Sequence, residues 1–307
     1  MLAIKKYKGP LKLIIKILVS ALAFFYITSE INFSLVWEEL KAINPIFLIL
    51  AVGFYCVSQL ISSCRLNTLF GTLPLNFPAL ANAKLYWVGM FYNFFLPGGV
   101  GGDGYKIIFL KRYFANPVKD ILGAILSDRL SGLTIISCII LALSFFIPQH
   151  LPYQKWYFLL IPVAVGSFFL FLVIMNKKLS KAFWSVSAFS VLIQGIQIVA
   201  VIFLLLAIDV DVSKHGMEYL FLFFVSTVAS AIPISLGGIG TREVVFYSGS
   251  LYMEVNPEQA LALSLLFYFT TLMSSLPGIY FILTPRAIHS EGKEIQTKKV
   301  STELNRA

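Results

Sequence analysis

The sequence predicts an all-α integral membrane protein with about six full transmembrane helices plus two glycine-tipped re-entrant hairpins in an inverted-topology repeat. Three observations support this prediction. Of the 307 residues, 58% are hydrophobic and only 13% are charged, which is not the composition of a soluble globular domain. Apolar runs long enough to cross a hydrocarbon core of about 30 Å recur from end to end. Two further apolar segments are interrupted in the middle by glycines and charged residues.

The full spans are predicted where an apolar run is long and unbroken. They are Leu13 to Thr28, Ile46 to Cys64, Ile121 to Ile147, Trp156 to Met175, Phe183 to Ile208 and Ala260 to Leu283. The first of them follows several lysines, as a signal peptide does. Its apolar run continues past Ala23 to Ile27, which favours an uncleaved anchor over a removed leader.

The distribution of basic residues indicates how the two interrupted segments, Phe77 to Tyr113 and Tyr219 to Met253, are threaded. Cytoplasmic loops of membrane proteins are enriched in lysine and arginine. The basic clusters are the N-terminus, 106–119, 177–181 and the C-terminal tail, whereas 30–41, 148–155 and 209–218 are poor in basic residues. All the basic clusters lie on the cytoplasmic side only if each interrupted segment enters and leaves the membrane from the same side.

This threading predicts one polytopic domain over 1–285 and a short polar cytoplasmic tail over 286–307. Repeat one covers about 11–147 and repeat two about 156–284, starting from the opposite side of the membrane. Inverted repeats of this kind occur in many transporters, whose sites lie near the midplane where interrupted helices meet. We expect a multi-pass protein of the cell (inner, cytoplasmic) membrane, with the N-terminus and the C-terminus both cytoplasmic.

The two breaks resemble one another in sequence. Gly98-Gly99-Val100-Gly101-Gly102-Asp103 aligns without gaps on Gly237-Gly238-Ile239-Gly240-Thr241-Arg242. Backbone that is not helical at membrane depth is tolerated only where protein surrounds it or water reaches it. The helix after each break would direct free N–H groups and the positive end of its dipole inward, and an anion is the natural ligand there.

Charged residues follow both breaks. Asp103 and Lys106 follow the first, and Arg242 and Glu243 follow the second. Asp103 and Arg242 occupy equivalent positions with opposite charge, so we hypothesise that they approach across the pseudo-two-fold axis. Arginine suits a phosphate because its planar fork donates two hydrogen bonds at once. The alternative is purely structural: Asp103 caps a helix, Arg242 pairs with Glu243, and the glycines serve close packing.

A third charged pair, Asp128-Arg129, lies inside a full span. Neighbouring helix residues diverge by about 100°, so at least one of the two must face a cavity or a hairpin. Arg129 is either a second anion contact or a structural partner of Asp103 or Glu243.

Other polar residues in the spans have two interpretations. They are Ser58, Gln59, Ser62, Ser63, Gln194 and Gln197. They are expected to form hydrogen bonds between helices, and the alternative is that they line a cavity.

Several classes of function do not fit the sequence. The net charge of +9 is spread over short clusters beside apolar runs, which suits anionic lipid headgroups and not nucleic acid. The three cysteines lie in apolar runs and the three histidines in loops or the tail, without metal-ligand spacing. No phosphate-binding loop or hydrolase motif is present. No metal and no cofactor is expected.

Three stretches, Asn93 to Asp103, Pro233 to Glu243 and Asp128 to Gly132, resemble the transmembrane flippase-like region of the lysylphosphatidylglycerol synthase family. The resemblance extends from the first span to about Leu283. It implies movement of lipids between leaflets, which in this family is joined to a separate soluble aminoacyl-transfer domain. The chain ends at Ala307 without room for that domain, so lipid synthesis is not expected. Stand-alone relatives are also linked to polyprenyl-phosphate sugar metabolism.

The expected function is therefore a transporter or flippase for an anionic or phosphate-bearing lipid. One alternative is an integral membrane glycosyltransferase or related enzyme acting on a polyprenyl-phosphate lipid. Another is a non-catalytic partner of a separately encoded lipid-modifying enzyme. The expected contacts to a headgroup or phosphate are Gly98, Gly99, Gly101, Gly102, Asp103, Lys106, Arg129, Gly237, Gly238, Gly240, Arg242 and Glu243. No catalytic residue is expected among them.

Overall fold

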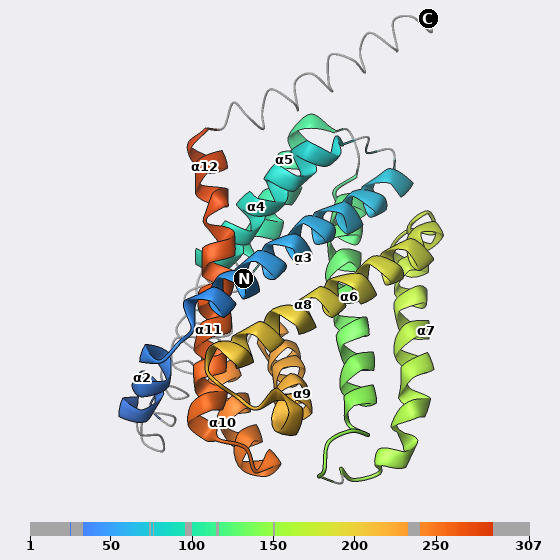
Figure 1. Cartoon of the computed structure of the whole chain (residues 1–307). Coiled ribbons are helices and arrows are strands. Elements are labelled where there is room, and N and C mark those ends of the chain that lie inside the picture. Colours follow the sequence, from blue (N-terminus) through green and yellow to red (C-terminus); the bar gives the residue numbers. More distant parts are fainter. Residues whose placement is uncertain are drawn as a thin grey trace, which may run out of the picture.

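A computed structural model describes residues 25, 33–73, 75, 77–95, 100–114, 117–149, 151–232 and 240–284. Within these residues the structure is helical and contains no strand (Figure 1). The α-helices are α2 (Phe33–Lys41), α3 (Pro45–Thr72), α4 (Ala79–Phe95), α5 (Gly101–Tyr113), α6 (Val118–Leu143), α7 (Tyr157–Met175), α8 (Phe183–Ala207), α9 (Val212–Ala231), α10 (Thr241–Met253), α11 (Pro257–Ser275) and α12 (Pro277–Leu283). The short 3-10 helices η1 (Gln154–Trp156) and η2 (Leu179–Ala182) precede α7 and α8.

Five helical stretches of the described part are long and apolar enough to cross a membrane. They are Pro45–Thr72, Val118–Leu143, Gln154–Met175, Leu179–Ala207 and Pro257–Leu283. Each coincides with one of the spans expected from the sequence, which confirms an integral membrane protein. The expected first span lies outside the described residues, apart from Phe25.

Two of these helices differ in detail from the expectation. α3 continues to Thr72, eight residues beyond the expected end at Cys64, so Arg65 lies inside the helix. The last expected span is divided into α11 and α12 at Leu276, immediately before Pro277. Proline lacks the N–H that would continue the hydrogen-bond ladder, which explains the division.

The two interrupted segments each form a pair of helices on either side of the glycines. α4 and α5 flank the first break, and α9 and α10 flank the second. α5 and α10 each have 13 residues. At 1.5 Å per residue each is about 20 Å long, which is shorter than the hydrocarbon core of about 30 Å.

The order of elements repeats along the chain with an offset of 139 residues, the offset that aligns Asp103 with Arg242. When the start of α5 is moved by this offset it falls on residue 240, and α10 begins at Thr241. The start of α6 falls on residue 257, which is where α11 begins. α3 likewise falls on α8. The helices therefore support the internal repeat that the glycine motifs suggest.

Two equivalent helices run in opposite directions in space. The equivalent helices α3 and α8 lie side by side and run antiparallel, since Ser58 contacts Gln197 whereas Arg65 contacts Ser190. In Figure 1 the α4/α5 pair lies toward the top of the bundle and the α9/α10 pair toward the bottom. This arrangement is the one that an inverted repeat requires.

Apolar side chains form two buried clusters. One joins α9, α10 and α11 with the end of α8, and it includes Phe224, Phe246 and Leu263. The other joins α4, α5, α7 and the start of α8 with the second half of α3, and it includes Phe70 and Leu110. α3, α6 and α8 contribute to both clusters, so these three helices hold the two ends of the molecule together.

Candidate functional site

The helix after the first break packs tightly against the helix before it. A Cβ atom on Gly102 would lie 1.9 Å from the carbonyl oxygen of Gly89, so only glycine allows this approach. The N–H of Gly102 donates a hydrogen bond of 2.8 Å to Oδ1 of Asn93. One free N–H at the start of α5 is thus satisfied by a side chain of α4. Gly101 begins α5, whereas Gly98 and Gly99 lie outside the described residues.

Asp103 lies in the first turn of α5 and joins two cations. Its Oδ2 forms an ion pair with Nε of Arg129 on α6, and its Oδ1 lies 3.8 Å from Nζ of Lys106. Lys106 also lies over the ring of Tyr86, 4.0 Å from the centroid. The Asp103 and Lys106 side chains are 13% and 6% exposed, while that of Arg129 is 41% exposed. Arg129 is therefore the most accessible charge of the first break.

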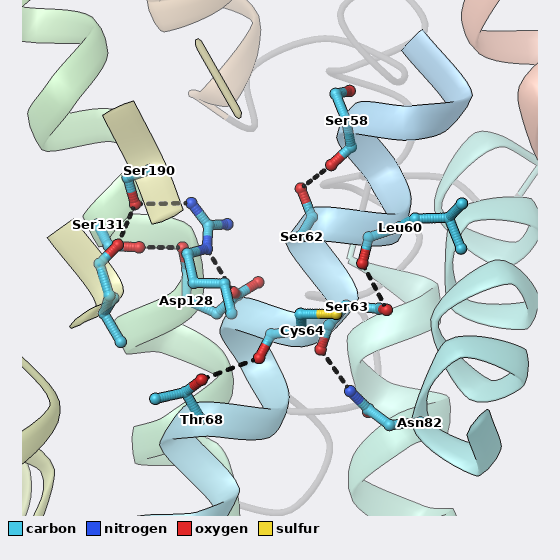
Figure 2. Close-up of polar contacts among 12 residues, drawn as sticks. Ser58, Leu60, Ser62, Ser63, Cys64, Thr68, Asn82, Asp128, Ser131 and Ser190 are labelled. Atoms are coloured by element: carbon cyan, nitrogen blue, oxygen red, sulfur yellow. Dashed lines mark hydrogen bonds and ion pairs between the residues drawn. The ribbon is translucent and has the colours of Figure 1, made fainter. Parts of the chain in front are cut away.

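A second ion pair lies next to the first, deeper in the protein. Nε of Arg65 lies 2.8 Å from Oδ1 of Asp128, and both side chains are 7% exposed. Nη1 of Arg65 donates to Oγ of Ser190 at 2.9 Å. Figure 2 shows Asp128 and Ser190 converging on this guanidinium. The contact joins α3, α6 and α8, the helices that both apolar clusters share.

The neighbours Asp128 and Arg129 point in different directions, as their helical spacing predicts. Asp128 faces Arg65 on α3, and Arg129 faces Asp103 on α5. Arg129 thus faces the helix that follows the first break, and Asp128 faces α3.

The second break is built differently. Gly240 has a φ of 88°, a conformation that favours glycine, and it stands at the N-cap of α10. Its N–H donates to Oε2 of Glu243 at 2.7 Å, and Oγ of Ser264 donates to Oε1 of Glu243 at 3.1 Å. One carboxylate oxygen of Glu243 therefore caps the start of α10, and the other joins α10 to α11. Gly237 and Gly238 lie outside the described residues.

Arg242 forms no ion pair with any residue of the described part of the chain. Its Cζ lies 4.9 Å from the centroid of Phe267, above the ring. Tyr55 stands edge-on to the same Phe267 ring at 5.5 Å. A guanidinium so placed keeps its hydrogen-bond donors for an anion, while the ring stabilises its charge.

The same 139-residue offset relates the contacts of the two breaks. It carries Asp103 to Arg242 and carries Asp128-Arg129 to Phe267-Tyr268. In the first half the break residue pairs with Arg129, and in the second half Arg242 lies over Phe267, one residue before the position equivalent to Arg129. Within the described residues, the Asp103 carboxylate thus has cationic partners, whereas Arg242 forms no ion pair.

The hypothesis that Asp103 and Arg242 approach one another stays a prediction; within the described residues the carboxylate of Asp103 pairs with Arg129 and Lys106. The two breaks nevertheless meet on one helix. The ring of Phe94, at the end of α4, lies 4.7 Å from that of Tyr268 on α11. Tyr268 directly follows Phe267, and the guanidinium of Arg242 lies over the ring of Phe267.

Arg65 is the charged residue that the sequence interpretation missed. It follows the point at which the apolar run of the second span was expected to end, and its partner is 63 residues away. The available signal was Asp128, a carboxylate inside a span that requires a cation nearby.

The described residues provide no centre for a metal ion. Within them, no group of three or more histidine, cysteine, aspartate or glutamate side chains is placed to hold one.

The fold defines an all-helical integral membrane protein with two interrupted segments, each followed by charged groups. A family model described as "Lysylphosphatidylglycerol synthase TM region" matches residues 13–179 and 175–278. The chain belongs to this family. It is also similar to a UPF0104 membrane protein of Pyrococcus horikoshii, with 30% identity over 86 residues. That match covers 27% of this chain and 26% of the relative.

Proposed function

We propose that this chain is a flippase-like transporter that moves a lipid with an anionic or phosphate-bearing headgroup between the two leaflets. The observation that carries the proposal is the guanidinium of Arg242, which lies at a helix start without a carboxylate partner among the described residues. Its neighbour Glu243 is engaged by Gly240 and Ser264. A phosphate oxygen is the partner that this arginine lacks.

The charge balance at the first break supports the same ligand class. Three cations, Arg65, Lys106 and Arg129, lie around two carboxylates, Asp103 and Asp128. Among these described residues the cations therefore outnumber the carboxylates by one. Charges in such surroundings are retained at a cost of a few kcal/mol each, which favours a functional role.

We place the two helix pairs in the membrane as re-entrant hairpins that enter from opposite sides. α5 and α10 are too short to cross on their own. With each pair returning to the side it came from, the basic loop around Lys111 and the tail both lie in the cytoplasm. The protein then resides in the cell membrane with both termini cytoplasmic.

The surroundings of the breaks suit a lipid better than a soluble anion. Phe95 and Val100 flank the first break and Ile232 flanks the second, and each is 52–53% exposed. In this proposal the acyl chains contact these apolar side chains from the bilayer. The headgroup meanwhile contacts the N–H groups and cations of the breaks, including Asp103, Lys106, Arg129, Arg242 and Glu243.

The test is leaflet-resolved lipid movement in liposomes that contain only this protein. Fluorescent phosphatidylglycerol and phosphatidylcholine are the probes, with dithionite quenching of the outer leaflet as readout. We expect movement of the anionic probe to fall about 10-fold or more in Arg242→Gln, since a hydrogen bond to a charged group contributes about 1.5–3 kcal/mol. The matched control is Arg112→Gln, which removes an exposed arginine at the end of α5.

Three results would count against the proposal. Equal rates of phosphatidylglycerol movement in the wild type and Arg242→Gln would show that Arg242 is not part of the site. A chemically altered lipid without transbilayer movement would favour the membrane enzyme. Movement that appears only with a separately encoded lipid-modifying enzyme would favour the partner role.

A further inference from the structure

A row of polar side chains, all buried except the half-buried Gln197, lies between α3 and α8, the two equivalent antiparallel helices. We call it the α3–α8 seam. Its members are Ser58, Ser62 and Arg65 of α3 and Ser190, Gln194 and Gln197 of α8. On each helix the members are three or four residues apart, so they occupy one face.

Hydrogen bonds close the seam at both ends. At one end, Nε2 of Gln197 lies 3.5 Å from Oγ of Ser58. At the other end, Nη1 of Arg65 donates to Oγ of Ser190. The two contacts are seven residues apart on each helix and in opposite order, so the polar row covers about 10 Å of the interface.

The middle of the seam is not satisfied. Oε1 of Gln194 is buried and has no hydrogen-bond partner in the described part of the chain, and the residue is 4% exposed. Ser62 donates to the carbonyl of Ser58 on its own helix and contributes no bond across the seam. An unpartnered buried acceptor costs about 1–3 kcal/mol. A leucine would avoid this cost, so the glutamine calls for a donor in another state of the protein.

The seam connects the two breaks. Arg65 holds Asp128, whose neighbour Arg129 pairs with Asp103 at the first break. At the opposite end, Tyr55 lies one turn before Ser58 and contacts the ring of Phe267. The guanidinium of Arg242 lies over the same ring. Hydrogen-bonding groups therefore line α3 from one cluster of charge to the other.

We propose that the α3–α8 seam is the path along which a polar, phosphate-bearing headgroup passes between the two breaks when α3 and α8 separate. This inference rests on the proposed function. Water and headgroup hydroxyls then supply the donor that Gln194 lacks, and the serines and glutamines replace part of the headgroup hydration. In the structure described here the helices are together and the path is closed.

The opening of the seam can be tested without any transport measurement. Cys56, Cys64 and Cys138 are replaced by alanine, and a single cysteine is introduced by Ser62→Cys or by Leu69→Cys. The two positions lie on the same helix and are 3% and 0% exposed. In proteoliposomes, a membrane-impermeant cationic methanethiosulfonate should label the first at least 10-fold faster than the second. Equal slow rates would overturn the proposal.

Transport tests the same path with a matched control. Gln194→Leu removes the unpartnered seam acceptor, and Thr270→Val removes another buried unpartnered oxygen, on α11 and outside the seam. Both variants should unfold at a temperature equal to or above that of the wild type. Movement of phosphatidylglycerol should fall 10-fold or more in Gln194→Leu alone, and an unchanged rate would overturn the proposal.

The two proposals can fail separately. If wild-type protein moves the anionic lipid in an Arg242-dependent way while Ser62→Cys stays unlabelled, the headgroup takes another path and the seam proposal falls. If Ser62→Cys is labelled but no lipid moves, the seam opens to water as proposed and the flippase function falls.

Discussion

Asp103 on α5 forms an ion pair with Arg129 on α6, and this contact ties the helix after the first glycine break to the middle of a candidate span. Arg129 is also the most exposed charge of that group, at 41%. Any anion that reaches the first break must therefore compete with a carboxylate that the protein itself supplies. The strength of this ion pair sets how readily Arg129 becomes available.

A double-mutant cycle measures that strength. Asp103→Asn, Arg129→Gln and the double variant are compared with wild type by unfolding in detergent. We expect a coupling of about 0.2–1 kcal/mol, because solvent screens a partly exposed pair. The coupling should fall further at high salt. A coupling of zero at low salt would show that the two residues do not interact in solution.

The buried pair of Arg65 and Asp128 should behave differently. Removing one partner leaves an uncompensated buried charge, so Arg65→Met should cost about 3–5 kcal/mol of stability. The double replacement of Arg65 by Met and Asp128 by Leu should cost clearly less than Arg65→Met alone. Chemical unfolding in detergent is the measurement. A double variant that is less stable than the single one would contradict this account of the pair.

The close approach at Gly102 gives a prediction with an internal control. Gly102→Ala places a methyl group against the Gly89 carbonyl, so α4 and α5 must separate, at a cost of about 1–3 kcal/mol. Gly104→Ala, two residues further along α5, meets no atom within 4 Å. It should stabilise the helix by about 0.5–1 kcal/mol. Thermal unfolding should therefore shift in opposite directions, and equal shifts would show that the helices are not packed in this way.

Glu39 on α2, outside the candidate spans, gives a pH-dependent prediction. Burial, and then the charges of Glu258 and Asp209, raise the pKa of Glu39 above its ordinary value of 4.5. Between the ordinary and the raised pKa the folded state binds more protons than the unfolded state. The contribution of Glu39 to stability is therefore lost as the pH rises through that interval.

Replacement of Glu39 by glutamine should make stability less dependent on pH and should raise the unfolding temperature at pH 7.5. The comparison is with wild type and with Glu38→Gln, the exposed neighbouring residue, each measured at pH 5 and pH 7.5. An identical pH dependence in wild type and Glu39→Gln would exclude this effect.

Much of the helical organisation could be predicted because it follows from local sequence. α5 and α10 end at Tyr113 and Met253, the last residues of the two interrupted segments. Apolar runs and glycine breaks are local signals, and the gapless alignment of the breaks gave the offset that the helices follow.

The partners of the charges could not be predicted in the same way. Asp103 was hypothesised to approach Arg242 because the two positions are equivalent by symmetry. Equivalent positions in two repeats do not determine how far apart the two side chains lie. In the first half itself, Lys106 and Arg129 are close enough to pair with Asp103. Arg65 was overlooked because a span was taken to end at the first charge, although a carboxylate on another helix compensates this one. α2 lies in a segment expected to be a loop, where it buries Val36.

The repeated architecture has a consequence for how the protein can be assembled. A half-length chain that paired with an inverted copy of itself would place identical residues at both breaks, with a carboxylate at each or a guanidinium at each. Here the equivalent positions hold Asp103, which forms an ion pair with Arg129, and Arg242, which lies over the ring of Phe267. The two breaks therefore differ in charge and in the residues that contact it. A homodimer of either half alone would lack one of the two kinds of site.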